Sequence, residues 1–335
     1  MQGILIIPIV LSFLICVFAI PIWIGKAKKI GLIWEDMNKY GFPKNVAGSG
    51  GLPVIFAAII GILVYIAIKT FYFNSSDNLI EIFAAITSLL ILAQIGIVDD
   101  LLGWRQGGLS KKIRVVLCFF AAIPLMVINA NNGMLNIPFV DINIGIIYPL
   151  ILIPIAIIGT ATTFNFLAGF NGLEASQGIL ILGALSLAAY FSGSSWLALI
   201  GLIVIASLIA FWIFNKYPAK TFPGDVLTYP IGGMIGIMAI LGGLEKFALF
   251  LFIPYILEVI LKLRGELKMQ SFGKPNKSND LDLAYEKIYG LEHLSIWILN
   301  KFGRANEKKV VYLINSLQIL IIILGFIIFR NFIFK

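Results

Sequence analysis

The stretch GILIIPIVLSFLICVFAIPIWI, from Gly3 to Ile24, contains no charged residue and decides the fold of the chain. A helix of about 20 apolar residues crosses the roughly 30 Å hydrocarbon core of a bilayer. This run is long enough, no basic residue precedes it, and it exceeds the core of a signal peptide, so we expect a retained membrane span. Comparable runs recur along the chain, such as Val311 to Phe329. The sequence therefore predicts an all-α, polytopic membrane protein.

The composition excludes a soluble globular protein. Of the 335 residues, 60% are hydrophobic and 13% are charged, and the mean hydropathy is +0.98, whereas soluble domains carry about 25% charged residues. The net charge of +8 is concentrated in loops, and we expect no nucleic-acid partner. Both cysteines, Cys16 and Cys118, fall inside expected spans, which argues against a disulfide framework and against a cysteine-based zinc site.

Apolar runs bounded by charged, Gly-rich or Pro-rich stretches predict about ten transmembrane helices. They lie near residues 3 to 25, 50 to 70, 79 to 98, 113 to 130, 144 to 163, 174 to 191, 196 to 214, 226 to 243, 246 to 262 and 310 to 330. Of the 25 Lys and Arg residues, 21 gather in the alternate loops 26–47, 99–114, 215–225 and 262–309. The positive-inside rule places these loops in the cytosol and both termini outside.

The chain is expected to form one integral membrane domain, 1–335, without an internal repeat or an inserted soluble domain. The cytosolic loop 263–309 is the longest. Within it, Leu291 to Phe302 is predicted to form a short amphipathic helix at the membrane interface.

The string GIVDDLLGW, residues 96–104, ends the third expected span with Asp99 and Asp100. The macrodipole disfavours carboxylates at a helix C-terminus, and two adjacent carboxylates repel each other. We therefore expect a cation beside the pair. The alternative is that both are solvated residues at the membrane interface, capped by Arg105, Lys111 or Lys112.

A second polar cluster, TATTFNFLAGFNGLEASQG at residues 160–178, joins the fifth and sixth expected spans. Gly169 allows the chain to turn so that Asn165 and Asn171 can converge. Amides beside a Gly-containing break suggest a ligand site that lines a cavity. A polar turn between two helices is the alternative interpretation.

The third cluster, NKYPAKTFPGDVLTYPIGG at residues 215–233, places Asp225 at the start of the eighth expected span. A carboxylate that caps the helix N-terminus is one explanation. Asp and Asn oxygens are also the hard donors that Mg²⁺ takes together with phosphate oxygens and water.

All three clusters are predicted at cytosolic helix ends, beside lysines. This arrangement suits a phosphorylated cytosolic substrate that meets a lipid, because a divalent metal and Lys neutralise phosphate charge together. A membrane transporter of a nucleotide sugar or a lipid phosphate is the alternative from another class. A transporter is expected to place its polar residues near the bilayer midplane, which weighs against it.

Five strings carry a resemblance to a known family: GLIWEDMNK (31–39), GIVDDLLGW (96–104), NFLAGFNGLEASQ (165–177), YPAKTFPGD (217–225) and LQILIIILG (317–325). Together they resemble the polyprenyl-phosphate sugar-1-phosphate transferases, the MraY/WecA-like family, and above all its dolichyl-phosphate N-acetylglucosamine-1-phosphate transferase branch. NFLAGFNGLE is the most specific string. Members of the family have ten transmembrane helices, in agreement with the apolar runs.

The resemblance implies transfer of N-acetylglucosamine-1-phosphate, or a similar sugar-1-phosphate, from a UDP-sugar to dolichyl or another polyprenyl phosphate, with release of UMP. This reaction is the first step of lipid-linked glycan assembly and requires Mg²⁺, for which Mn²⁺ is an alternative. UDP-GalNAc and UDP-MurNAc-pentapeptide stay open as donors. The host membrane would be the cell membrane of a prokaryote or the endoplasmic reticulum of a eukaryote, with the active site in the cytosol. A homodimer is left open.

The resemblance also implies roles for individual residues. Asp225 and Asn165 match metal ligands of the family, and Phe222 matches an aromatic residue that stacks on uracil. Asp99 and Asp100 match the paired aspartates. Further residues implied in substrate or phosphate binding are Asn171 in the uridine pocket, Lys112 or less closely Lys111 on phosphate, and Glu174, Asp36 and Asn38.

The acceptor phosphate has a second pKa of about 6, so it is mostly dianionic at neutral pH and hardly needs a general base. We therefore expect direct in-line attack on the β-phosphorus of the donor, with metal and lysine stabilising the charge. Asp99 would orient the acceptor or deprotonate it at lower pH, and Asp100 would support Lys112 and the metal shell. A two-step route through an aspartyl phosphate is the alternative.

Two stretches depart from the family pattern. Asn45 to Gly50 lacks the Pro-Glu that relatives carry before the second helix. The last cytosolic loop reads QSFGKPNK at 270–277, without the His and Arg that contact pyrophosphate and sugar in relatives. Lys274 is expected to substitute for them through its charge, and the single histidine, His293, is expected to be structural.

Overall fold

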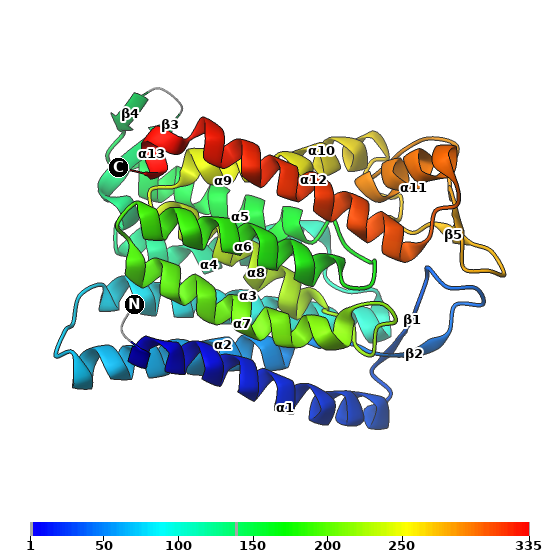
Figure 1. Ribbon diagram of the computed structural model, residues 1–335, viewed down its shortest axis with the longest axis horizontal. Coiled ribbons are helices and arrows are strands. Elements are labelled where there is room, and N and C mark those ends of the chain that lie inside the picture. Colours follow the sequence, from blue (N-terminus) through cyan, green and yellow to red (C-terminus); the bar gives the residue numbers. More distant parts are fainter. Residues whose placement is uncertain (1–2, 138–139, 335) are drawn as a thin grey trace.

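The computed structural model describes residues 3–137 and 140–334. Long helices lie side by side along the longest axis of the molecule, and the start of the first helix lies at the same end of the bundle as the last helix (Figure 1). The helices are α1 (Ile6–Ile30), α2 (Gly51–Ala67), α3 (Leu79–Gln106), α4 (Lys111–Val127), α5 (Ile153–Phe164), α6 (Leu173–Phe191), α7 (Ser195–Asn215), α8 (Asp225–Leu241), α9 (Glu245–Leu251), α10 (Ile253–Arg264), α11 (Leu291–Phe302), α12 (Glu307–Ile328) and α13 (Arg330–Ile333).

The strands form short antiparallel hairpins in the loops. The pairs are β1 (Ile33–Glu35) with β2 (Lys44–Ala47), β3 (Met134–Ile137) with β4 (Val140–Asn143), and β5 (Lys274–Pro275) with β6 (Leu281–Asp282). The fold is therefore a helical bundle, as expected, with hairpins only between helices.

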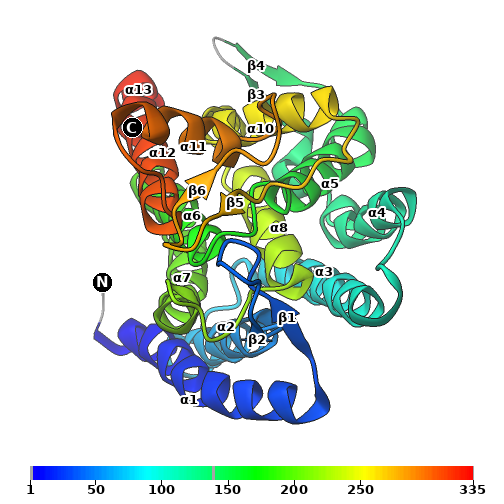
Figure 2. The ribbon, with the colours of Figure 1, turned by 90° about the vertical axis from the view of Figure 1, so that its right-hand side faces the viewer.

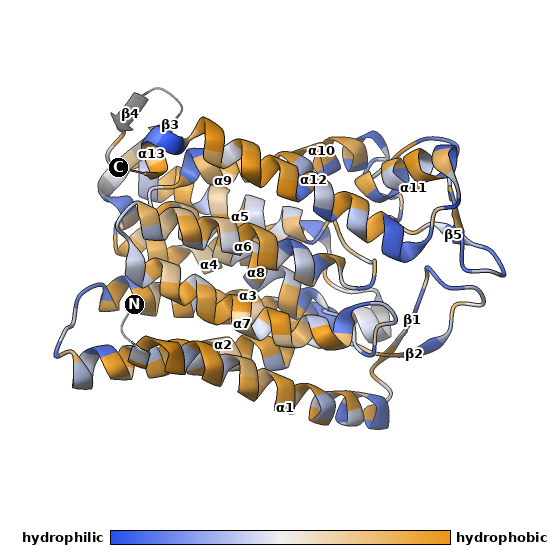
Figure 3. Ribbon diagram, in the orientation of Figure 1, coloured by the Kyte–Doolittle hydropathy of each residue, from blue (hydrophilic) through white to orange (hydrophobic). Residues whose placement is uncertain are grey.

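Several helices have the length and composition of membrane spans. Within the described residues, six segments are long and apolar enough: Gly3–Ile30, Gly51–Tyr72, Leu79–Trp104, Leu173–Phe191, Ser195–Asn215 and Glu307–Ile328. Two shorter apolar helices are Tyr148–Phe164 and Asp225–Leu241. Apolar residues cover the helices, and hydrophilic residues gather toward helix ends and loops (Figure 3). This is the make-up of a polytopic membrane protein.

Two helices show the largest differences from the expected spans. α3 continues to Gln106, beyond the expected end at 98, so Asp99 and Asp100 lie inside the helix and not at its C-terminus. The expected span 246–262 is divided into α9 and α10 at Phe252, two residues before Pro254. Proline lacks the N–H that would continue the hydrogen-bond ladder, which accounts for a break at this position. The helix predicted from Leu291 to Phe302 is confirmed as α11.

α8 lies in the core of the bundle, and every residue from Val226 to Ile240 is buried. Glycines allow neighbouring helices to approach it closely. A Cβ at Gly232 would lie 2.4 Å from the backbone oxygen of Thr160 on α5, and a Cβ at Gly233 would lie 2.1 Å from the side chain of Leu92 on α3. Membrane helices pack through such small residues, because lipid supplies no hydrophobic drive for their association.

At the end of the bundle that carries the β1–β2 and β5–β6 hairpins (Figure 2), backbone hydrogen bonds join two loops. The Phe222 N–H donates to the Ala47 carbonyl at 2.8 Å, and the Gly50 N–H donates to the Phe222 carbonyl at 2.8 Å. The Gly51 N–H donates to the Pro223 carbonyl at 2.9 Å. The loop before α2 thereby holds the loop before α8 and fixes the start of α8.

Replacing Gly96 of α3 by Ala is expected to destabilise the fold, because the added Cβ would lie 2.3 Å from the backbone oxygen of Asp225. Overpacking of this kind costs about 1–3 kcal/mol. Gly183 on α6 is the matched control, since a Cβ there meets no atom within 4 Å. Thermal unfolding of the detergent-solubilised protein measures both variants. Equal unfolding temperatures for Gly96→Ala and Gly183→Ala would contradict a close contact between α3 and α8.

Candidate active site

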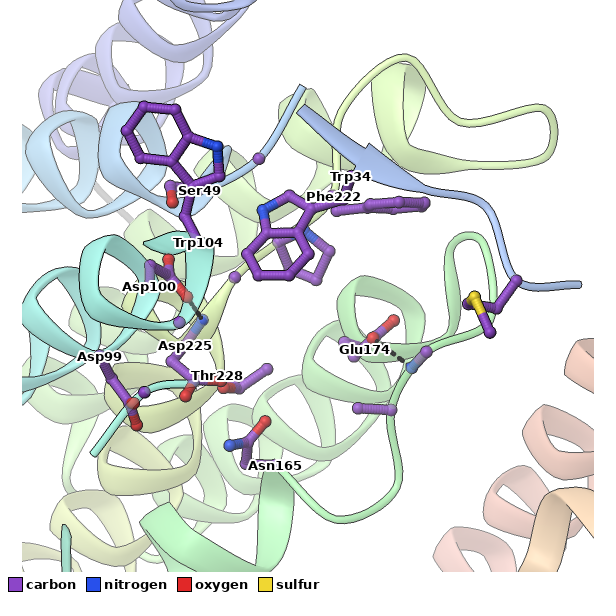
Figure 4. A pocket seen from close by; sticks show the side chains of 18 of the residues that line it. Trp34, Ser49, Asp99, Asp100, Trp104, Asn165, Glu174, Phe222, Asp225 and Thr228 are labelled. Carbon is purple, nitrogen blue, oxygen red and sulfur yellow. Dashed lines mark hydrogen bonds between the residues drawn. The ribbon is translucent and has the colours of Figure 1, made fainter. Parts of the chain in front are cut away.

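A cavity of about 720 Å³ opens where the C-terminal part of α3 meets the N-terminus of α8 (Figure 4). Its wall comes from segments far apart in the sequence: the β1–β2 hairpin, the end of α3, and the loops before α6, before α8 and after α10. The structure brings together here six of the residues that the sequence singled out, namely Asp99, Asp100, Asn165, Glu174, Phe222 and Asp225.

Asp100 joins α3 to α8. Its Oδ1 accepts the backbone N–H of Asp225 at 2.7 Å, and its Oδ2 accepts that of Val226 at 3.5 Å. Gly224, at φ +70°, permits this approach, since a Cβ there would lie 2.2 Å from Asp100 Oδ2. The free N–H groups and the macrodipole of a helix N-terminus favour a carboxylate. Asp100 therefore caps α8 and holds Asp225 at the cavity wall.

Asp99 is almost completely buried, and several donors occupy its oxygens. Asp99 Oδ1 accepts from the Leu109 N–H at 2.7 Å and from Arg114 Nη2 at 3.0 Å. Asp99 Oδ2 lies 2.6 Å from Arg114 Nε and accepts from the Tyr229 hydroxyl at 3.3 Å. The two groups form an ion pair with one hydrogen bond, from Nη2, and one close charge contact, at Nε. Asp99 thus fixes Arg114 at the cavity wall.

A cation does lie beside the aspartate pair, as expected. It is Arg114, in the first turn of α4, which the sequence prediction did not include. Lys111 is exposed and donates to the Leu267 carbonyl at 2.7 Å. Lys112 is also exposed, and neither lysine lines the cavity. The side chain of Arg105 lies outside the described residues. The sequence carried one signal for Arg114: successive residues of a helical turn point in different directions, so only one of several neighbouring cations can face α3.

Asn165 at the end of α5 and Asp225 at the start of α8 line the same cavity (Figure 4). Within the described ranges, no group of three or more His, Cys, Asp and Glu side chains is arranged to hold a metal ion. Mg²⁺ does not need such a group, because it takes one or two carboxylates and completes its shell with phosphate oxygens and water. One carboxylate and one amide at a cavity match that mode.

Buried oxygens of the cavity wall lack hydrogen-bond partners among the residues that the structure describes. Among these atoms are Glu174 Oε2, Asn215 Oδ1 and Thr228 Oγ1. The other Glu174 oxygen accepts the Gly169 N–H at 2.8 Å. Buried polar atoms are nearly always paired, so these oxygens indicate that the cavity receives a polar ligand or ordered water.

Three further residues from the sequence prediction, Asn171, Asp36 and Asn38, lie outside the cavity lining and brace the loops behind it. Asn171 Oδ1 accepts from the Ala219 N–H at 2.7 Å, and Asn171 Nδ2 donates to Asp36 Oδ2 at 3.5 Å. Asn38 Nδ2 donates to the Gly169 carbonyl at 3.0 Å. The structure thus brings these side chains together as links between loops.

Aromatic rings form another part of the wall. Phe222 lines the cavity together with Trp34 and Trp104, which the sequence prediction did not include (Figure 4). Trp34 packs against Gly48, where a Cβ would lie 2.5 Å from the indole nitrogen. Both tryptophans lie in the strings that carried the family resemblance, and this position was the signal available in the sequence. Flat rings on a polar cavity suit a ligand with a planar base.

The loop between α10 and α11 contributes Gln270 and Phe272 to the cavity. Lys274 lies outside the lining and faces a second cavity of about 620 Å³, which shares Gln270 and Phe272 with the first. His293 is buried behind this loop: its Nδ1 accepts the Tyr289 N–H at 3.4 Å, and its Nε2 lies 3.2 Å from the Phe272 carbonyl. Burial lowers the pKa of His293, so the neutral ring donates Nε2–H to Phe272, in keeping with a structural position.

Comparison with known proteins places these features in a family. Residues 82–243 match the family model described as glycosyl transferase family 4. A Saccharolobus solfataricus protein, provisionally named a UDP-N-acetylglucosamine–dolichyl-phosphate N-acetylglucosaminephosphotransferase, is 37% identical over 327 residues, which is 96% of each chain.

Two more distant relatives show the breadth of the likeness. A Dictyostelium discoideum protein with that enzyme name is 29% identical over 72% of this chain and 67% of its own. A phospho-N-acetylmuramoyl-pentapeptide-transferase of a Geobacillus species is 24% identical over 82% of this chain and 86% of its own. The relationship over nearly the whole chain confirms the resemblance seen in the sequence, and the chain is a member of glycosyl transferase family 4.

Proposed function

We propose that this protein transfers N-acetylglucosamine-1-phosphate from UDP-N-acetylglucosamine to dolichyl or another polyprenyl phosphate and releases UMP. The observation that carries the proposal is the meeting of Asp225, Asn165, Arg114 and Phe222 around one cavity. A UDP-sugar combines a planar base with a doubly charged pyrophosphate. The aromatic wall suits the base, and the guanidinium and oxygen donors suit the phosphates and their metal.

The names of two relatives favour N-acetylglucosamine as the sugar. The Geobacillus relative acts, by its name, on a muramoyl-pentapeptide donor, so UDP-MurNAc-pentapeptide and UDP-GalNAc are the competing donors within the same reaction class. Transport of a nucleotide sugar or lipid phosphate has less support. The β1–β2 hairpin that lines the cavity lies at one end of the bundle (Figure 1), whereas a transporter site is expected near the midplane.

In the proposed reaction, an oxygen of the lipid phosphate attacks the β-phosphorus of the donor. The bond from that phosphorus to the bridging oxygen breaks, and UMP leaves with that oxygen. The acceptor is already an anion, so no side chain has to remove a proton from it. Asp225 and Asn165 would hold Mg²⁺, which when bound neutralises phosphate oxygens and stabilises charge on the leaving group.

The roles of the other residues follow from their contacts. Arg114 takes the phosphate-binding role that the sequence suggested for Lys112, and Asp99 orients Arg114 through the ion pair. Phe222 stacks on uracil. Glu174 offers its unpaired oxygen to a hydroxyl or N–H group of the donor.

Transfer of labelled sugar phosphate tests the function directly. Purified protein with UDP-N-acetylglucosamine and dolichyl phosphate is expected to release UMP only when Mg²⁺ is present, with EDTA abolishing and Mg²⁺ restoring the reaction. Asp225→Asn should raise the Mg²⁺ concentration needed for half-maximal rate or abolish transfer, because the variant lacks the charged ligand. A panel of UDP-sugars identifies the donor. UMP release without lipid phosphate, or normal Mg²⁺ dependence in Asp225→Asn, would refute the assignment.

Arg114→Gln is expected to reduce kcat/KM for the UDP-sugar by about 10²-fold or more, a loss typical of removing a donor that stabilises developing charge. Arg114→Lys keeps the charge next to Asp99 but loses the two-pronged contact, so it should recover part of the rate. Lys112→Gln is the matched control and should change kcat/KM by less than about threefold, in line with an exposed charge. Kinetics in which Lys112→Gln is the more damaging change would return the role to Lys112.

We also propose ten membrane spans in one domain, with both termini outside and the cavity facing the cytosol. The eight apolar helical segments, together with α4 and the α9–α10 pair, add up to ten. The start of α1 and the end of α12 lie at the end of the bundle opposite the cavity loops (Figure 1). Those loops hold most of the Lys and Arg residues, as the positive-inside rule requires.

Single cysteines test this topology, since Cys16 and Cys118 are buried. Ser278→Cys in the last loop should react with a membrane-impermeant thiol reagent only from the cytosolic side, and Ser76→Cys between α2 and α3 only from outside. Labelling of both from one side would overturn the topology.

A further inference from the structure

Two carboxyl groups and one lysine form a buried cluster, called the compartment below, behind the loop between α10 and α11. Glu258 of α10 and Glu292 of α11 are both 0% exposed, and Lys262 of α10 is 9% exposed. Lys262 Nζ lies 3.5 Å from Glu258 Oε1. The two carboxyl groups converge at Gly290, where an added Cβ would lie 2.7 Å from Glu292 Oε2 and 3.0 Å from Glu258 Oε1. This compartment is distinct from the cavity that holds the proposed reaction.

The two carboxyl groups have different surroundings. Glu258 Oε2 accepts the Leu291 N–H at 2.6 Å and so caps the first turn of α11. Neither oxygen of Glu292 has a hydrogen-bond partner in the described part of the chain. A buried carboxylate without a partner is very costly, and groups in this position usually keep their proton instead.

The charges in the compartment do not balance if both acids are ionised. From α10, Glu258, Lys262 and Tyr255 face Glu292, and from α6 Glu174 contributes a further carboxyl group. His293, next to Glu292 on α11, is neutral, since burial lowers its pKa. Lys262 can neutralise only one carboxylate. Burial first, and the Glu258 charge second, raise the pKa of Glu292 well above its usual value.

The compartment supports the wall of the active-site cavity. Lys262 donates to the Ser271 hydroxyl, and His293 contacts the carbonyl of Phe272. The ring of Phe272 packs on Gly169, where a Cβ would lie 2.7 Å from the ring. Residues 270–272 are therefore held from behind by α10 and α11 and face the cavity in front.

We propose that Glu292 carries a proton in the folded protein while Glu258 stays ionised beside Lys262, so that the three side chains form a neutral support that positions residues 270–272 for donor binding. Glu292 is then a positioning residue. As the pH rises through its pKa, the proton leaves, an uncompensated charge remains in the compartment, and the wall loosens. The protonated form is the one that binds donor well.

The proposal predicts different unfolding temperatures for two Glu→Gln substitutions. Glu292→Gln replaces a neutral donor by a neutral donor of the same shape and should leave the unfolding temperature close to that of the wild type. Glu258→Gln removes the partner of Lys262 and should lower it clearly. Glu266→Gln, at an exposed position in the same loop, is the control for an ordinary surface change.

Enzyme kinetics and infrared spectroscopy distinguish a protonated Glu292 from a residue that only packs in the structure. In the wild type, the KM for the UDP-sugar donor should rise as the pH exceeds the pKa of Glu292, with a limiting slope of about tenfold per pH unit. The reason is that the fraction of protein with protonated Glu292 falls by that factor. The change in kcat should be smaller. Glu292→Gln should abolish that rise, and Glu266→Gln should keep it. The infrared difference spectrum between the wild type and Glu292→Gln should contain the C=O band of a buried protonated carboxyl, which the wild type has and the variant has lost.

The kinetic experiment rests on the proposed function, whereas the unfolding and infrared experiments do not. If the wild type turns over no UDP-sugar, the proposed function fails and the other two experiments still decide the protonation of Glu292. A Glu292→Gln variant that misfolds or loses as much stability as Glu258→Gln would overturn the proposal. So would an infrared difference spectrum between the wild type and Glu292→Gln that lacks the protonated carboxyl band, or an alkaline rise in KM that the substitution does not change.

Discussion

The hydrogen bond from the Asp225 backbone N–H to the Asp100 carboxylate is the contact on which the site depends. α8 is buried along nearly its whole length, so its first N–H groups need a partner from the protein. A carboxylate on α3 supplies that partner and a favourable charge for the helix dipole. The contact is possible because Gly96 and Gly224 leave room for the two backbones. It brings the end of α3 and the start of α8 to one cavity.

The acidic residues around this contact have different roles. Asp100 caps α8, and Asp99 holds Arg114 through an ion pair at 2.6 Å. Asp225 lines the cavity, and Glu174 keeps one oxygen without a partner. Most carboxylates therefore position other groups. Such an arrangement suits a transfer between two phosphates, where the reactants carry the reactive groups and the protein orients them and balances their charge.

The loops at this end are held by a different kind of interaction from the helices. Helices pack through glycines and apolar side chains, whereas the loops are held by side chains of other loops or of a helix that bond to the loop backbone. Asn171 links to Ala219, Asn38 to Gly169, and His293 to Phe272. Short loops have little apolar surface to bury, so satisfying backbone groups across loops is the available means of ordering them. A cavity wall ordered in this way needs less rearrangement when ligand binds.

The sequence by itself determined the helical membrane class, most of the helices and the family, because uninterrupted apolar runs and a specific string such as NFLAGFNGLE are local features. It also identified Asp99, Asp100, Asn165, Phe222 and Asp225, which share the cavity. Only the tertiary structure decided which cation meets the aspartates: Arg114, and not Lys112, faces α3. The tertiary structure also places Asn171 behind the cavity lining, where it links two loops. Glu292 is buried, although its helix was expected at the membrane interface. Partner choice and burial depend on helix rotation and on contacts between segments distant in the chain, which a local pattern does not encode.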